Sequence, residues 1–166
     1  AYRRYKLNLQ LISNGDSRRW VLKDPSHLWA PEALLSTFPD ACIIQMHRDP
    51  CKLIPSVASL VYTTRQMVEP DIDKHRIGRR ELAQWSSLLS NLDLFRSNYS
   101  SSSIYDVSMD ELQQDPAAVI KGIYDHFSLN QRNNFDSEVK KMVSNFRRDN
   151  LHSQNSHSYT PEEFGL

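Results

Sequence analysis

Glycine is scarce in this sequence of 166 residues, and its scarcity excludes two common nucleotide-binding motifs. The four glycines, Gly15, Gly78, Gly122 and Gly165, lie far apart in the chain. A dinucleotide-binding fingerprint and a Walker A loop both need several glycines within a few residues, because the backbone must approach the phosphates closely. Neither motif is present.

Long apolar runs, metal-ligand clusters and an excess of charge of one sign are also lacking. No apolar run approaches the roughly 18 residues of a membrane-spanning helix, so we expect no transmembrane segment. Two cysteines, Cys42 and Cys51, cannot form a four-cysteine zinc site, and the six histidines are dispersed, so we predict no bound metal. Both cysteines adjoin apolar stretches and are expected to be buried thiols.

The formal net charge is zero, but the charge is unevenly distributed. Residues 1–24 carry six basic and two acidic groups, whereas residues 98–166 carry six basic and ten acidic groups. No polybasic surface of the kind that binds nucleic acid results, and we expect no nucleic-acid partner. The basic first segment is compatible with a small anionic ligand or with ordinary solvated surface charge.

The periodicity of apolar residues predicts a single α/β domain over residues 1–166. Strands that alternate with helices are typical of a parallel sheet with flanking helices. Strands are expected at 20–23, 42–46 and 103–107, helices at 2–13, 26–38, 50–66, 79–96, 115–127 and 135–148, and an irregular tail at 151–166. In the helix over 79–96, the apolar face consists of Leu82, Trp85, Leu88, Leu89, Leu92 and Phe95.

Two of the expected strands end in residues that can carry chemistry, and ligands of such folds lie beyond the carboxyl ends of the strands. Arg48 follows the strand at 42–46, and its guanidinium can hold a phosphate with two hydrogen bonds. The next helix offers free backbone N–H groups and a positive dipole end, and Ser56 lies in its second turn. The alternative is that Arg48 pairs with a carboxylate such as Asp49 and that Ser56 has no ligand.

The end of the strand at 20–23 supplies two further candidates, Lys23 and His27. An ammonium group beside a phosphate site can neutralise charge that builds up on a leaving group. The ordinary pKa of histidine makes His27 a candidate general base. The alternatives are that Lys23 pairs with Asp24 or points to solvent, and that His27 is a capping or packing residue.

These motifs resemble those of the sulfotransferase family. The resemblance covers residues 3–166 and is closest to the bacterial-type branch related to the tyrosyl-protein sulfotransferases. It rests on the blocks Trp20-Val-Leu-Lys-Asp-Pro-Ser-His27, Phe38-Pro-Asp-Ala41 and Met46-His-Arg-Asp-Pro50 with Ser56 and Ser59, on Tyr105-Asp106-Val107 with Asp115-Pro116, and on the ending His157-Ser-Tyr159 and Phe164-Gly-Leu166.

The resemblance implies a P-loop-kinase-like fold that binds 3′-phosphoadenylyl sulfate (PAPS) and releases adenosine 3′,5′-bisphosphate (PAP). It implies that Arg48 and Ser56 hold the 3′-phosphate and that Lys23 lies near the sulfuryl group. The group is transferred to a hydroxyl or amine acceptor, and the chemistry needs no metal.

One feature of the family is not matched by these residues, namely the loop that wraps the 5′-phosphosulfate. We therefore expect the chain to correspond to the C-terminal portion of the family, with the N-terminal strand and loop missing and with a partner chain as a possible source of the missing strand. Two alternatives to an active enzyme follow: a catalytically inactive structural or interaction subunit of a larger assembly, and a nucleotide sensor. The sequence predicts neither the acceptor nor the cellular compartment.

Overall fold

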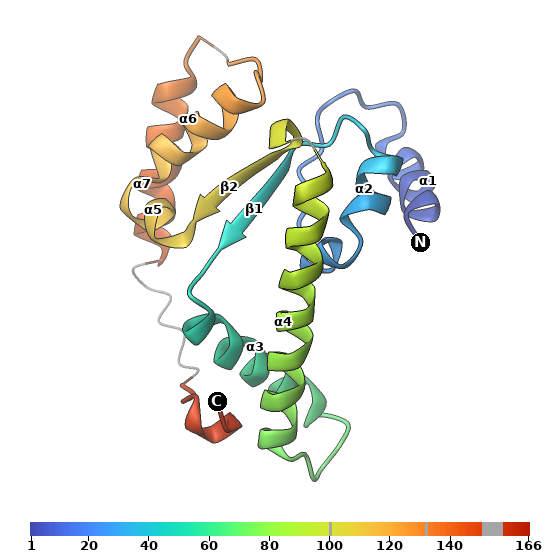
Figure 1. Cartoon of the computed structure of the whole chain (residues 1–166). Helices are drawn as coiled ribbons and strands as arrows, with labels where there is room; N and C mark the ends of the chain where they lie inside the picture. The colour runs from blue at the N-terminus through green and yellow to red at the C-terminus, as the bar shows by residue number, and fades with distance from the viewer. Residues whose placement is uncertain (100, 132, 151–157) are drawn as a thin grey trace.

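Two parallel strands form the sheet of the chain, as the computed structural model shows for residues 1–99, 101–131, 133–150 and 158–166 (Figure 1). Strand β1 (Ile43–His47) pairs with β2 (Ile104–Ser108), with Ile43 opposite Ile104 and His47 opposite Ser108. Parallel strands need a long crossover, which α3 (Pro50–Arg65) and α4 (Lys74–Asn98) provide. The predicted α/β class and parallel pairing are confirmed.

The remaining elements agree with most of the predicted helices. They are α1 (Tyr2–Ser13), η1 (Pro25–Trp29), α2 (Pro31–Thr37), η2 (Ser101–Ser103), α5 (Met109–Gln114), α6 (Pro116–His126), α7 (Phe135–Asn150) and η3 (Glu162–Phe164). The helix predicted over 26–38 is divided at Ala30, because Pro31 starts a new helix at its first position. The short helix α5 was not predicted; the Ser108 hydroxyl caps it by accepting a hydrogen bond from the Asp110 N–H.

The strand predicted over 20–23 is wrong. These residues form an irregular connection between α1 and η1, in which Val21 is 92% exposed and Trp20 and Leu22 are partly exposed. An extended segment becomes a strand only when its N–H and C=O groups find a neighbouring strand. In the part of the chain that the structure describes, β1 pairs with β2 alone. The partner chain expected to complete the sheet therefore stays a prediction.

Helix α4 covers one face of the sheet. Its Leu92 and Phe95 pack against Ile104, with Ile43, Leu28 and Leu35 around them. Of the apolar face predicted for this helix, Leu88, Leu92 and Phe95 are buried, whereas Leu82 and Leu89 remain nearly half exposed. Helix α6 lies on the other face, where Gly122 leaves space for the Tyr105 hydroxyl.

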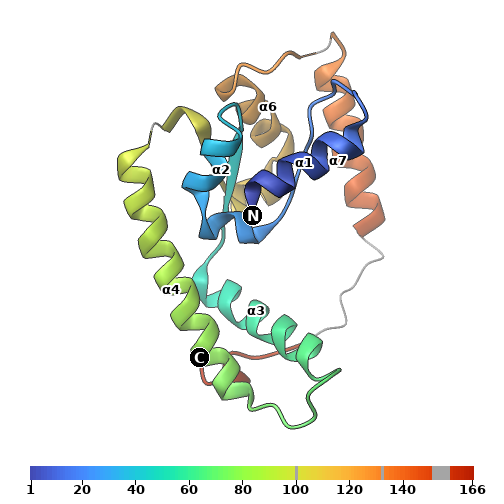
Figure 2. The ribbon, with the colours of Figure 1, turned by 90° about the vertical axis from the view of Figure 1, so that its right-hand side faces the viewer.

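A second core joins α3, α4 and the C-terminal residues. Ala58, Ile77 and Phe164 are almost fully buried together, and Gly78 of α4 lies directly against the backbone of Phe164. The C-terminus accordingly ends beside α4 and α3 (Figure 2). Of the tail predicted to be irregular, residues 151–157 lie outside the described residues, and residues 158–166 contain the single short helix η3.

The two cysteines are less buried than predicted. Cys42 is intermediate and Cys51 is exposed, and both are free thiols. Cys51 follows Pro50 at the beginning of α3, at the end of the sheet rather than within a core, so its side chain faces outward.

Candidate anion-binding site at the carboxyl end of the sheet

The turn between β1 and α3 is held by Asp49. Its carboxylate Oδ1 accepts a hydrogen bond from the Cys51 N–H at 2.9 Å. Its backbone oxygen accepts from the N–H groups of Lys52 and Leu53 at 3.0 and 2.9 Å, and Pro50 has no N–H. The first turn of α3 therefore has its donors satisfied, in contrast to the free N–H groups expected from the sequence. An anion at this end must be held mainly by side chains and the helix dipole.

Arg48 leaves this turn with an exposed side chain, between the last residue of β1 and the cap of α3. Within the described residues its guanidinium makes no hydrogen bond or ion pair, and Asp49 is engaged in capping. The alternative pairing of Arg48 with Asp49 is therefore not what the structure shows. Ser56, half-buried in the second turn of α3, likewise has no hydrogen-bond partner among those residues. Both side chains are available to a ligand.

A network of four polar side chains lies on the α4 face of the sheet, next to this turn and on its strand side. The Arg96 guanidinium donates two hydrogen bonds to the Asp106 carboxylate, one of them at 2.8 Å, and a third to Gln45 Oε1 at 2.8 Å. His47 Nε2 lies 2.6 Å from the same Asp106 carboxylate. The network therefore joins α4, the middle of β2 and the last residue of β1.

The network fixes the charge of Asp106. Hydrogen bonds from Arg96, and to a smaller extent from His47, lower the pKa of Asp106 to about 2 despite partial burial. The carboxylate in turn raises the pKa of Arg96. Since an ionised carboxylate can only accept hydrogen bonds, the proton between Asp106 and His47 belongs to Nε2 of His47.

The two candidates from the end of the predicted first strand lie on the connection and on η1. Lys23 is exposed and makes no hydrogen bond or ion pair with another described residue. Asp24 next to it caps η1 through the Ser26 N–H at 2.8 Å, and this bond is the main cause of its lowered pKa. The alternative pairing of Lys23 with Asp24 is thus limited to a weak charge interaction.

His27 is held between two tyrosines of α1. Its Nδ1 lies 3.0 Å from the Tyr2 hydroxyl, and its ring contacts the rings of Tyr2 and Tyr5 at centroid distances of 5.7 and 5.8 Å. His27 also lines a small cavity of about 30 Å³, and Gln45 of β1 is another of its lining residues. The structure thus brings η1 beside β1 on the α4 face, while Arg48 and Ser56 lie at the strand end.

Sequence reasoning missed Arg96 and Asp106. The available signal was an acidic residue in the middle of an otherwise apolar strand, which a buried strand tolerates only with a partner. The spacing of residues in the sequence did not indicate that Arg96 is the partner of Asp106.

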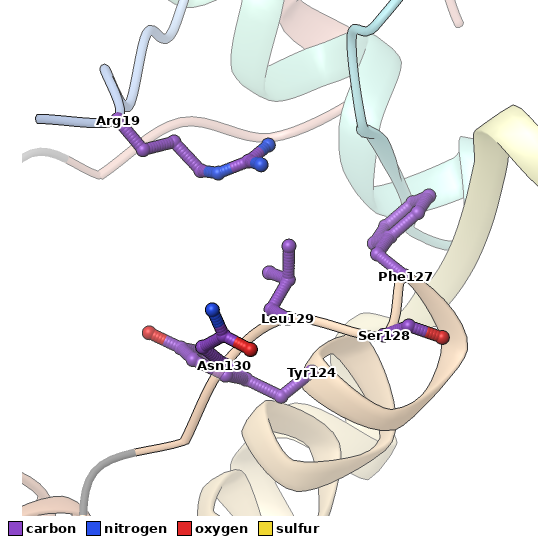
Figure 3. A pocket seen from close by; sticks show the side chains of 6 residues that line it. All are labelled: Arg19, Tyr124, Phe127, Ser128, Leu129 and Asn130. Carbon is purple, nitrogen blue, oxygen red and sulfur yellow. The ribbon is translucent and has the colours of Figure 1, made fainter. Parts of the chain in front are cut away.

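A larger cavity of about 330 Å³ lies away from this site. Arg19 points across it from the first connection toward residues at and after the end of α6, as Figure 3 shows. The lining residues are Arg19, Tyr124, Phe127, Ser128, Leu129 and Asn130. Phe127 packs near Tyr105, at the beginning of β2, so the cavity lies toward the amino ends of the strands. It is therefore distinct from the end that carries Arg48.

Two classes of feature are absent from the described residues. No group of three or more histidine, cysteine or acidic side chains is placed to hold a metal ion. No helix in these parts of the chain is both long and apolar enough to cross a membrane.

Comparison with known proteins identifies the class that the fold and site define. The family model described as "Sulfotransferase family" matches residues 3–133, and the chain belongs to the sulfotransferase family. Among curated proteins, the omega-hydroxy-beta-dihydromenaquinone-9 sulfotransferase Stf3 of Mycobacterium bovis and that of Mycobacterium tuberculosis are each 27% identical over 112 residues. The match covers 66% of this chain and 28% of each relative.

Two solved sulfotransferase structures have similar folds. STF1 from Mycobacterium tuberculosis is 34% identical with a TM-score of 0.78, and STF9 from Mycobacterium avium is 25% identical with a TM-score of 0.84. Each match covers 99% of this chain but only 41% and 42% of the respective relative. The chain therefore spans less than half the length of the relatives that it matches.

Proposed function

We propose that this chain forms the 3′-phosphate-binding part of a sulfotransferase that uses PAPS and releases PAP. The observation that carries the proposal is that Arg48 and Ser56 have no hydrogen-bonding partner within the described residues, at the carboxyl end of the sheet of a sulfotransferase-family fold. Nothing observed in the described residues favours the alternative of an inactive structural subunit.

The chemistry of this end of the sheet fits a phosphate dianion. Arg48 presents planar donors that match two phosphate oxygens, and the Ser56 hydroxyl can donate one more hydrogen bond. Because the N–H groups of the first turn of α3 are already used, these two side chains carry most of the recognition. Each charge-assisted bond contributes about 1.5–3 kcal/mol.

Lys23 and His27 are proposed to act on the sulfuryl end of the donor and on the acceptor. PAPS supplies the sulfuryl group, and its transfer leaves negative charge on the departing phosphate oxygen, which an ammonium such as that of Lys23 stabilises. For His27 to accept a proton at Nε2, its Nδ1 must carry the other proton and donate it to the Tyr2 oxygen, 3.0 Å away. The Tyr2 hydroxyl can accept this hydrogen bond, so its position is compatible with the reactive tautomer.

The acceptor is proposed to be a hydroxyl group. The matched curated relatives are named omega-hydroxy-beta-dihydromenaquinone-9 sulfotransferases, and that name contains a hydroxy group. An amine acceptor remains the competing chemistry, and transfer assays with matched alcohol and amine acceptors distinguish the two.

Binding and transfer assays on the native protein that contains this chain test the proposal. The R48A variant is expected to bind PAP about 10- to 100-fold more weakly, with a smaller loss for S56A. R65A is a matched control, because Arg65 is on the same helix but pairs with Glu69. K23A and H27A are expected to lower the transfer rate more than PAP affinity. Undiminished PAP affinity in R48A would contradict the proposed site.

A further inference from the structure

Arg48 is the residue that follows His47, and His47 is tied to the network of Asp106, Arg96 and Gln45. The network is the only set of hydrogen-bonded side chains in the described residues that connects α4, β1 and β2. Along the direction of the strands, the network lies between the apolar contacts of Ile43 and Ile104 and the turn that carries Arg48.

The order of apolar and polar residue pairs along the α4 face of the sheet follows from the register of the strands. Partners in parallel strands point to the same face, so Ile43 and Ile104 form one level and Gln45 and Asp106 form the next. Phe95 packs on the first level, and Arg96, the next residue of α4, reaches the second. His47 is two residues beyond Gln45 on the same face and reaches back to Asp106.

We propose that Asp106, held in place by Arg96, positions Arg48 through its hydrogen bond to His47. The inference rests on the proposed function, since it assigns Arg48 to phosphate binding. Asp106 anchors the turn on its strand side, and Asp49 anchors it on its helix side by capping α3. With both sides fixed, the direction in which the exposed Arg48 leaves the backbone is set before a ligand arrives. Asp106 and Arg96 are positioning residues and do not contact the phosphate.

The proposal predicts an effect opposite in sign to simple electrostatics. Replacing Asp106 by Ala removes a negative charge near the anion site, leaves Arg96 without its counter-ion and removes the acceptor of the His47 hydrogen bond. Coulomb attraction alone would then make phosphate binding tighter. Loss of positioning makes it weaker, because a misdirected Arg48 pays an additional ordering cost on binding.

Calorimetric binding to the native protein, with PAP and adenosine 5′-monophosphate as probes, tests the inference. D106A is expected to weaken PAP binding about tenfold and to leave binding of the monophosphate, which lacks the 3′-phosphate, within about twofold. H47A is expected to act in the same direction while leaving the bonds between Asp106 and Arg96 intact. D110A is the matched control: it removes the same charge at the start of α5, beside the same sheet end, and the hydrogen bonds of Arg96 and His47 go to Asp106 and Gln45 instead.

A double-mutant cycle separates positioning from a general structural role. If Asp106 acts through Arg48, D106A has little further effect on PAP binding in an R48A background. Equal or tighter PAP binding by both D106A and H47A, with R48A strongly impaired, overturns the inference and leaves the proposed function standing. A native protein that does not prefer PAP to the monophosphate overturns the proposed function and this inference together.

Discussion

Replacement of Gly78 by alanine should destabilise this protein, although the same change in an exposed helix interior is normally stabilising by about 1 kcal/mol. A Cβ atom at Gly78 would lie 2.0 Å from the backbone oxygen of Phe164 and 3.0 Å from its carbonyl carbon. A backbone carbonyl cannot move aside as the end of a long side chain can. The C-terminal residues would therefore have to leave α4.

The size of the effect follows from what Phe164 buries. Its side chain is 1% exposed and packs with Ala58 and Ile77. Losing a buried phenylalanine contact costs about 3–5 kcal/mol, and the helix propensity of alanine returns about 1 kcal/mol. We expect G78A to lower the free energy of unfolding by about 2–4 kcal/mol in urea denaturation.

A matched substitution controls for the general effect of alanine in a helix. In G122A the new Cβ would meet the Tyr105 hydroxyl at 2.3 Å, and this hydroxyl is the far end of a side chain, which can shift at a smaller cost than a backbone carbonyl. We expect G122A to stay within about 1 kcal/mol of the native protein. In an F164A background the cost of G78A should largely disappear, since the burial of the phenylalanine side chain is already lost. A G78A protein as stable as the native one would show that the backbone of Phe164 does not restrict the size of residue 78.

Two further predictions concern the candidate site. As pH falls below about 4, the native protein should lose about 1 kcal/mol of its stability advantage over D106N. The lowered pKa of Asp106, about 2, means that the carboxylate stabilises the fold above its unfolded pKa and that this contribution is lost as pH falls through the folded value. The side chain is 45% exposed, so solvent screening reduces the size. Denaturation at pH 2, 3 and 5 measures this, and a difference that does not change with pH would contradict it. D49A should lower stability by about 1 kcal/mol through loss of the cap, whereas D49N should not; equal melting temperatures of D49A and the native protein would show that the cap is unimportant.

Most of the longer helices and the strand β1 were predictable because their signals are local, whereas α5 and the division at Ala30 were not predicted. Asp115 and Pro116 predicted the start of α6 as a cap followed by a proline in the first turn. In the structure Asp115 accepts a hydrogen bond from the Ala118 N–H, and Pro116 is the first residue of the helix. The apolar residues at 42–46 were correctly expected to form a strand that ends just before Arg48.

The features that were wrongly predicted or not predicted depend on contacts between residues far apart in the sequence, which a local pattern does not contain. The run from Trp20 to Lys23 has the composition of a buried strand, but the described chain provides no strand beside it. The pairing of Arg96 with Asp106 requires both the register of β1 against β2 and the placement of α4 across the sheet. Neither can be derived from the spacing of the two residues in the sequence.

Recognition of the 3′-phosphate by Arg48 is best tested by measuring the affinity of the native protein and of R48A for PAP and for adenosine 5′-monophosphate. The native protein is expected to prefer PAP, and R48A is expected to lose about 10- to 100-fold in PAP affinity, with little change for the monophosphate. Equal affinities of the native protein for the two nucleotides, or an R48A variant that keeps the preference, would contradict recognition of the 3′-phosphate by Arg48.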